Sequence, residues 1–173
     1  MRLSLSLLVV GALLCLLHPF ASARAGEMSA ADAVSVICPG RGALAPLFQS
    51  SADRHHVPAA VLVAQFRIEA SCNAKAVNVT TKSFGAMGIK LDGSANVDHL
   101  EAGELMDPAT NIDLGARHLR RWARTCGSLA GSLSIYHGRT HCRHHRGDRY
   151  VGRVLGLAEW ARRQLRRLQE KRS

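Results

Sequence analysis

The chain contains 173 residues and carries a formal net charge of +10 at pH 7. This length suits one domain with a single hydrophobic core, and beyond the N-terminus no apolar run is long enough to span a membrane. The positive charge favours polyanionic partners such as nucleic acid, an anionic membrane or an acidic cell-wall polymer. Nucleotide-dependent and serine-hydrolase chemistry are not indicated, because we find neither a phosphate-binding glycine loop nor a Ser-His-Asp arrangement.

Residues 1–25 have the features of a secretory signal sequence. Arg2 precedes an apolar stretch over residues 3–17, and small residues follow that stretch. Because the stretch is shorter than the roughly 20 residues of a membrane span, we favour cleavage over the alternative of an uncleaved anchor. The segment predicts a periplasmic or secreted, soluble protein and argues against nucleic acid as a partner.

Four cysteines follow the predicted signal sequence: Cys38, Cys72, Cys126 and Cys142. An even number of cysteines in an exported chain predicts two disulfides, and four cysteines allow three pairings. We favour Cys126 with Cys142 and Cys38 with Cys72, and four reduced thiols in the core are the alternative.

The first half of the exported part alternates between helical and irregular patterns. We expect an irregular segment over residues 26–40 and a helix over 44–56, where apolar residues recur at helical spacing. A second helix, over 58–68, is apolar on almost every face, which is typical of a buried helix. Residues 71–106 are rich in Gly, Asn, Ser, Asp and Thr and predict loops or a small β-hairpin beside a cleft.

The second half predicts three more helices. Asp107 suits an N-cap and Pro108 a first helical position, while Gly127 can end the helix that they begin. Further helices are expected over residues 128–136 and 149–167, with a basic, histidine-rich loop between them. The sequence therefore predicts a mainly α domain with a loop-rich lobe and no internal repeat.

Glu69 is the most informative residue of this pattern. It follows the buried apolar helix and precedes a polar loop, so its carboxyl lies near hydrocarbon and near the negative end of a helix dipole. Both effects raise the pKa of a carboxyl, as a general acid near neutral pH requires. The alternative is an ordinary helix-end carboxylate paired with Arg67 or Lys75.

Four sequence blocks occur in a fixed order: EASCNAKA at 69–76, GAMGIKL at 85–91, DPATNIDLGARHL at 107–119, and YHG at 136–138 followed by YVGRVL at 150–155. Their order and spacing resemble the soluble (SLT) type of lytic transglycosylase of the lysozyme-like superfamily, over about residues 43–160. The chain departs from that family at Ala70, Cys72, Ala74 and Leu91, where serine, an aromatic residue, proline and glutamine are usual. The lost serine and glutamine remove polar contacts near Glu69.

The resemblance implies a mainly α (α+β lysozyme-like) fold, in which a helical domain and a loop-rich or small β-hairpin lobe flank a glycan cleft. The N-terminal segment would cover residues 26–42, the transglycosylase domain 43–161 and a basic C-terminal tail 162–173. The implied reaction is cleavage of the β-1,4 bond between N-acetylmuramic acid and N-acetylglucosamine in peptidoglycan, with a 1,6-anhydro product. Neither a cofactor nor a metal is implied.

In this resemblance Glu69 is the catalytic residue, and the substrate-binding residues are Ser71, Met87, Gly88, Ile89 and Tyr136. Tyr136 would contact the glutamate or the substrate. Met87 and Ile89 also suit the core, Ser71 could instead cap the loop, and Asn111 suits a structural role in the first turn of its helix. Lys90 would face an acidic stem peptide if its loop turns toward the cleft.

Three alternatives stay open. If Asp92 or Asp98 folds near Glu69, a lysozyme-type hydrolase follows, since such enzymes use two carboxyl groups. The changes at Ala70 and Leu91 motivate a non-catalytic peptidoglycan-binding protein, and the charge alone motivates a membrane-active protein.

For residues 141–145 we favour a disulfide-tied basic loop over a metal site, because the spacing matches no zinc pattern.

The expected partners are peptidoglycan glycan strands and a cell-envelope machine for secretion, pilus assembly or conjugation, since small exported enzymes of this kind open the wall locally. We expect a monomer.

Overall fold

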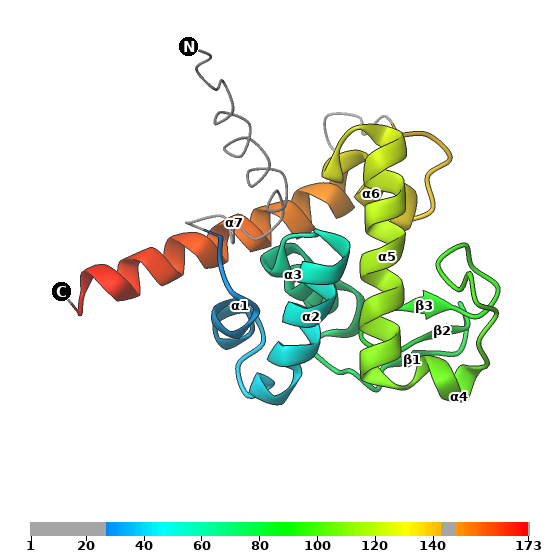
Figure 1. Ribbon diagram of the computed structural model, residues 1–173, viewed down its shortest axis with the longest axis horizontal. Helices are drawn as coiled ribbons and strands as arrows, with labels where there is room; N and C mark the ends of the chain where they lie inside the picture. The colour runs from blue at the N-terminus through cyan, green and yellow to red at the C-terminus, as the bar shows by residue number, and fades with distance from the viewer. Residues whose placement is uncertain (1–26, 143–147, 173) are drawn as a thin grey trace, which may run out of the picture.

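The structure is a computed structural model that describes residues 27–142 and 148–172 (Figure 1). The predicted signal sequence over 1–25 lies outside these residues, as do the last three positions of the 141–145 cluster. The helices and strands are α1 (Ala30–Ile37), η1 (Gly42–Leu44), α2 (Ala45–His55), α3 (Ala59–Ala70), β1 (Val77–Asn78), β2 (Ser83–Phe84), β3 (Ile89–Lys90), α4 (Ala102–Leu105), α5 (Pro108–Cys126), α6 (Leu129–Tyr136) and α7 (Arg149–Glu170). The predicted mainly α, lysozyme-like architecture is confirmed.

One expectation is wrong, because residues 26–40 are not irregular throughout. Helix α1 begins after Ser29, whose hydroxyl accepts a hydrogen bond from the Asp32 amide at 3.1 Å. The helix buries a face of small and branched residues, comprising Ala30, Ala33, Val34 and Ile37. An amphipathic pattern of only eight residues is too short to identify a helix from sequence. Such a short helix is stabilised mainly by its packing against the rest of the protein.

Helix α3 is the centre of the helical body. It packs against α1, α2 and α7, which surround it in Figure 1. The side chains from Ala59 to Phe66 are all buried, and the Phe66 ring lies 5.3 Å from that of Phe48 on α2. The apolar character of every face of α3, seen in the sequence, follows from this central position.

The predicted ends of the later helices are confirmed. The Asp107 carboxylate accepts a hydrogen bond from the Thr110 amide at 2.8 Å and so caps α5, which ends at Gly127 with a φ of 66°. Helix α7 runs from Arg149 to Glu170, so the basic segment after residue 161 continues the helix whose first part packs on the core. No helix among the described residues is both long enough and apolar enough to cross a membrane.

The loop-rich lobe contains a small antiparallel sheet of order β1-β2-β3, in which Phe84 pairs with both Val77 and Ile89. Asn111, at the start of α5, ties this lobe to the helical body. Its amide nitrogen donates to the carbonyls of Phe84 and Leu105, and its oxygen accepts from the Met87 amide at 2.7 Å. The structural role expected for Asn111 is therefore confirmed.

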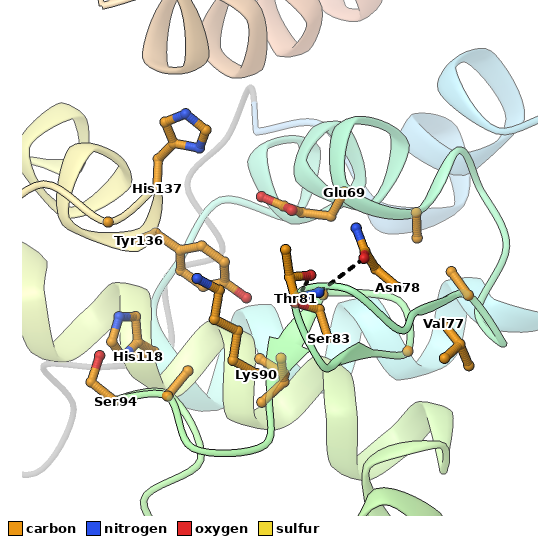
Figure 2. A pocket seen from close by; sticks show the side chains of 18 of the residues that line it. Glu69, Val77, Asn78, Thr81, Ser83, Lys90, Ser94, His118, Tyr136 and His137 are labelled. Atoms are coloured by element: carbon orange, nitrogen blue, oxygen red, sulfur yellow. Dashed lines mark hydrogen bonds between the residues drawn. The ribbon is translucent and has the colours of Figure 1, made fainter.

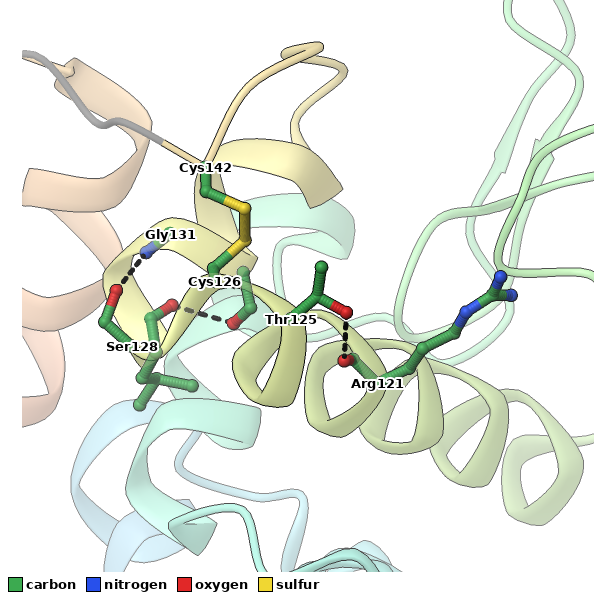
Figure 3. The surroundings of a disulfide bond; sticks show 8 residues. Arg121, Thr125, Cys126, Ser128, Gly131 and Cys142 are labelled. Carbon is green, nitrogen blue, oxygen red and sulfur yellow. Dashed lines mark hydrogen bonds between the residues drawn. A yellow bond between two sulfur atoms is a disulfide. The ribbon is translucent and has the colours of Figure 1, made fainter.

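Both favoured disulfide pairings are confirmed. Cys38 at the end of α1 pairs with Cys72, and Cys126 at the end of α5 pairs with Cys142 (Figure 3). The second disulfide lies directly against α6, since a Cβ at Gly131 would lie 2.8 Å from the Cys126 Cβ. Helix α6 is thus held against the end of α5, which fixes the position of the residues that follow Tyr136.

Candidate active site

Glu69 lies in the last turn of α3, which ends because Ser71 and Cys72 adopt left-handed φ angles of 50° and 63°. The Cys38–Cys72 disulfide fastens this turn to α1. Cys72 is buried, so the disulfide fills space at the position where the resembling family has an aromatic side chain. The fastening holds the end of α3, and with it Glu69, in one place.

The Glu69 carboxyl is enclosed on two sides. The Tyr150 hydroxyl from α7 donates a hydrogen bond to Oε1. On the other side Gly88, with a φ of 60°, approaches so closely that a Cβ there would lie 3.1 Å from Oε2. Glycine is thus required at this position both for the backbone angle and for the space around the carboxyl.

Burial raises the pKa of Glu69 above the ordinary value for a glutamate. The hydrogen bond from Tyr150 and the positive charges of His137, Lys90 and Arg153 oppose this rise but do not cancel it. The direction is the one expected from the sequence, and burial is its main cause. The side chain can therefore hold a proton at a pH at which an exposed glutamate has lost it.

Tyr150 is a functional residue that the sequence analysis did not single out. Burial and the neighbouring Glu69 carboxylate raise the pKa of its hydroxyl far above the ordinary tyrosine value, so the hydroxyl remains a donor. Because that donor is directed at Oε1, the acidic proton of Glu69 belongs on Oε2. Tyr150 stands in the last matched block, but its partner lies 81 residues away in the chain.

A pocket of about 680 Å³ opens beside Glu69, between the end of α3, the sheet, α5 and the end of α6 (Figure 2). Of the residues expected to bind substrate, Ser71, Gly88, Ile89 and Tyr136 line this pocket with Glu69. Uncharged polar side chains form much of the remaining wall: Asn78, Thr81, Ser83 and Ser94. Such a wall suits a ligand rich in hydroxyl and amide groups.

Met87 does not fit the expectation of a substrate-facing residue. Its side chain is fully buried against Gly115 of α5, where the absence of a Cβ makes room for it. Only its backbone reaches the site, since its carbonyl accepts a hydrogen bond from the Tyr136 hydroxyl at 2.6 Å. Met87 is thus a core residue that anchors a pocket residue.

Tyr136 lies in the pocket as expected, but its hydroxyl bonds to Met87 and not to Glu69. Its ring meets His118 of α5 edge to face at 5.2 Å. His118 also lines the pocket and is 5% exposed, and burial lowers its pKa to about 4, so the ring is neutral at neutral pH. The two aromatic rings form a rigid, uncharged floor.

Among the described residues, Glu69 is the only carboxylate that lines the pocket. Asp98 pairs with Arg117 of α5, and Asp92 is exposed on the lobe outside the pocket. The described residues show neither alternative pairing of Glu69, since Lys75 donates to the Met106 carbonyl and Arg67 is directed at the Cys72 sulfur. Within residues 27–142 and 148–172 no three His, Cys, Asp or Glu side chains are grouped to hold a metal ion.

The comparison with protein-family models matches the Transglycosylase SLT domain over residues 46–150, which is more than half of the chain. The matched span includes Glu69, Tyr150 and every residue that lines the pocket. No curated protein matches the chain, and no solved structure matches it.

Proposed function

The chain belongs to the transglycosylase SLT domain family, and we propose that it is a peptidoglycan lytic transglycosylase. It cleaves the β-1,4 bond between N-acetylmuramic acid and N-acetylglucosamine and forms a 1,6-anhydro product. The observation that supports this proposal most directly is Glu69, a carboxyl whose burial raises its pKa, at the edge of a pocket whose wall includes several hydroxyl and amide side chains.

In the proposed reaction Glu69 acts first as a general acid. The proton on Oε2 passes to the glycosidic oxygen, the C1–O bond of the muramoyl residue breaks, and the N-acetylglucosamine part leaves as an alcohol. The raised pKa of Glu69 supports this step, because a general acid must still be protonated at the working pH.

The same carboxyl then acts as a general base. It removes a proton from the C6 hydroxyl of the muramoyl residue, and the C6 oxygen bonds to C1. Glu69 is protonated again at the end, no water is consumed, and no second carboxyl is needed. The presence of one carboxylate in the pocket favours this route over the two-carboxyl route of a hydrolase.

The test is digestion of purified peptidoglycan, with the soluble products analysed by mass spectrometry. The unaltered protein is expected to release muropeptides that are one water lighter than the products of hydrolysis. Glu69→Gln should lower the rate at least a hundredfold, since general acid–base catalysis contributes about 10²–10⁴-fold. Products of full hydrolytic mass would indicate a lysozyme instead.

Asp92→Asn is the matched control, because it removes a carboxylate from the same lobe but outside the pocket. It should leave the rate unchanged. Equal lysis by the Glu69→Gln protein would refute the assignment of the acid. Binding to the wall without any product, by the unaltered protein, would favour the non-catalytic alternative.

We also propose that the protein works outside the cytoplasm, as residues 1–25 predict. The two disulfides support this location, since they persist in oxidising compartments. Work beside an envelope machine and a monomeric state remain predictions, which cross-linking in cells and light scattering of the purified protein would test.

A further inference from the structure

Three side chains near Glu69 interact with it electrostatically without taking part in the two proton transfers. His137, Lys90 and Arg153 each lower the pKa of a carboxyl that must keep its proton to act as an acid. Their charges therefore work against the first step of the proposed reaction. The same charges favour the carboxylate form that the second step needs, and a side chain among them that also reaches into the pocket can contact a ligand.

Lys90 is the clearest case. It stands on β3, its exposed side chain lines the pocket, and Figure 2 shows it extending from the strand into the pocket. No hydrogen bond or ion pair joins its ammonium group to another residue in the described part of the chain. The block GAMGIKL places Lys90 where the resembling family carries methionine, so the charge is a feature of this chain.

His137 follows Tyr136 at the end of α6 and lines the same pocket, and Figure 2 shows it above Lys90. Its ring stacks on that of Tyr150, with 4.3 Å between the centroids and 5° between the planes. Because Tyr150 is itself held by Glu69, the imidazole has a defined position beside the acid. Lys90 and His137 thus line one pocket with Glu69.

We propose that Lys90 binds a carboxylate carried by the glycan strand next to the bond that is cleaved. The preferred substrate of the protein is therefore a strand that carries free carboxylates. This specificity rests on the proposed function. Peptidoglycan offers two such sources, the lactyl carboxylate of a muramoyl residue without a peptide and the carboxylates of a stem peptide. Both present the same group to the ammonium of Lys90.

The experiment compares kcat/KM on four soluble glycan preparations by quantifying products with mass spectrometry. Strands with stem peptides and strands stripped of peptides are each used as they are and after conversion of their carboxylates to neutral amides. The kcat/KM of the unaltered protein should be about fivefold higher on an acidic preparation than on its amidated counterpart. This ratio is the one expected from the loss of a single partly solvated ion pair. The pair of preparations that shows this preference identifies the source of the carboxylate.

Lys90→Met should bring the ratio close to one, and Lys90→Arg should retain it. Lys82→Met is the matched control, because it removes an equal charge from the same lobe outside the pocket and should keep the full ratio. Circular dichroism of each variant establishes that it is folded.

Equal efficiency of the unaltered protein on acidic and amidated strands would overturn the inference while leaving the proposed function intact. A ratio that Lys90→Met does not change would also overturn it. If Lys90 acts only on the ionisation of Glu69, its substitution shifts the pH profile equally on both substrates and leaves the ratio unchanged. Absence of product from all four preparations would instead refute the proposed function itself.

Discussion

The buried histidine on α5 makes stability depend on pH in a calculable way. His118 is 5% exposed, and its Nδ1 has no hydrogen-bond partner among the described residues. Burial, assisted by the positive charge of Arg121, lowers its pKa from 6.5 to about 4. The folded protein therefore holds this ring in its neutral form under conditions in which the unfolded chain protonates it.

The sign and the size of the effect follow from these two values. Below about pH 6.5 the unfolded state binds a proton that the folded state does not, so the free energy of unfolding decreases as the pH decreases toward about 4. Above pH 6.5 this contribution to stability is fully present. At about 1.4 kcal/mol for each pH unit, the difference amounts to about 3 kcal/mol.

The assay is urea unfolding followed by far-UV circular dichroism at pH 7 and pH 4. The variant His118→Gln, which cannot titrate, should lose about 3 kcal/mol less stability between these pH values than the unaltered protein. The exposed His99→Gln serves as control and should lose as much as the unaltered protein. The raised pKa of Glu69 acts in the opposite direction but is common to all three proteins, so it cancels. An equal loss in His118→Gln and the unaltered protein would refute the reasoning.

Three further predictions follow from single contacts. Tyr150→Phe removes the hydrogen bond that lowers the pKa of Glu69, so the decline of wall cleavage with rising pH should move to higher pH while the rate falls about tenfold through loss of orientation. An unmoved profile would contradict this role. Replacing Cys38 and Cys72 together by alanine opens a link between residues 34 apart and should cost about 3–4 kcal/mol, measured by urea unfolding against the oxidised unaltered protein. Asn111→Ala removes two buried hydrogen bonds and one partly buried hydrogen bond to backbone groups and should cost about 2–4 kcal/mol in the same assay. A cost below about 1 kcal/mol would indicate that water replaces the amide.

The departures from the family pattern have different structural meanings. Cys72 stands where the family has an aromatic residue, and its disulfide to α1 holds the same turn covalently in place of aromatic packing. Leu91 stands where the family has glutamine. No comparable replacement is seen there, because Leu91 packs against the core and offers the pocket no polar group. The pocket therefore relies on the hydroxyl and amide groups of the sheet for polar contacts with a strand.

What the sequence determined by itself is local or carried by motifs. The helix after Asp107 follows from a capping carboxylate and a proline, and its end follows from a glycine with a positive φ. The burial of α3 follows from its apolar faces, and Glu69 follows from its place after that helix. These features depend on residues a few positions apart, so they can be predicted from the local sequence.

The tertiary structure alone decided which side chains meet Glu69. It brings Tyr150 to the acid and directs Tyr136 to the Met87 carbonyl, although both tyrosines stand in matched blocks. It also moves Met87 into the core while its neighbours Gly88 and Ile89 line the pocket. Such contacts join residues that are tens of positions apart, and they depend on how the helices pack, which no local pattern encodes.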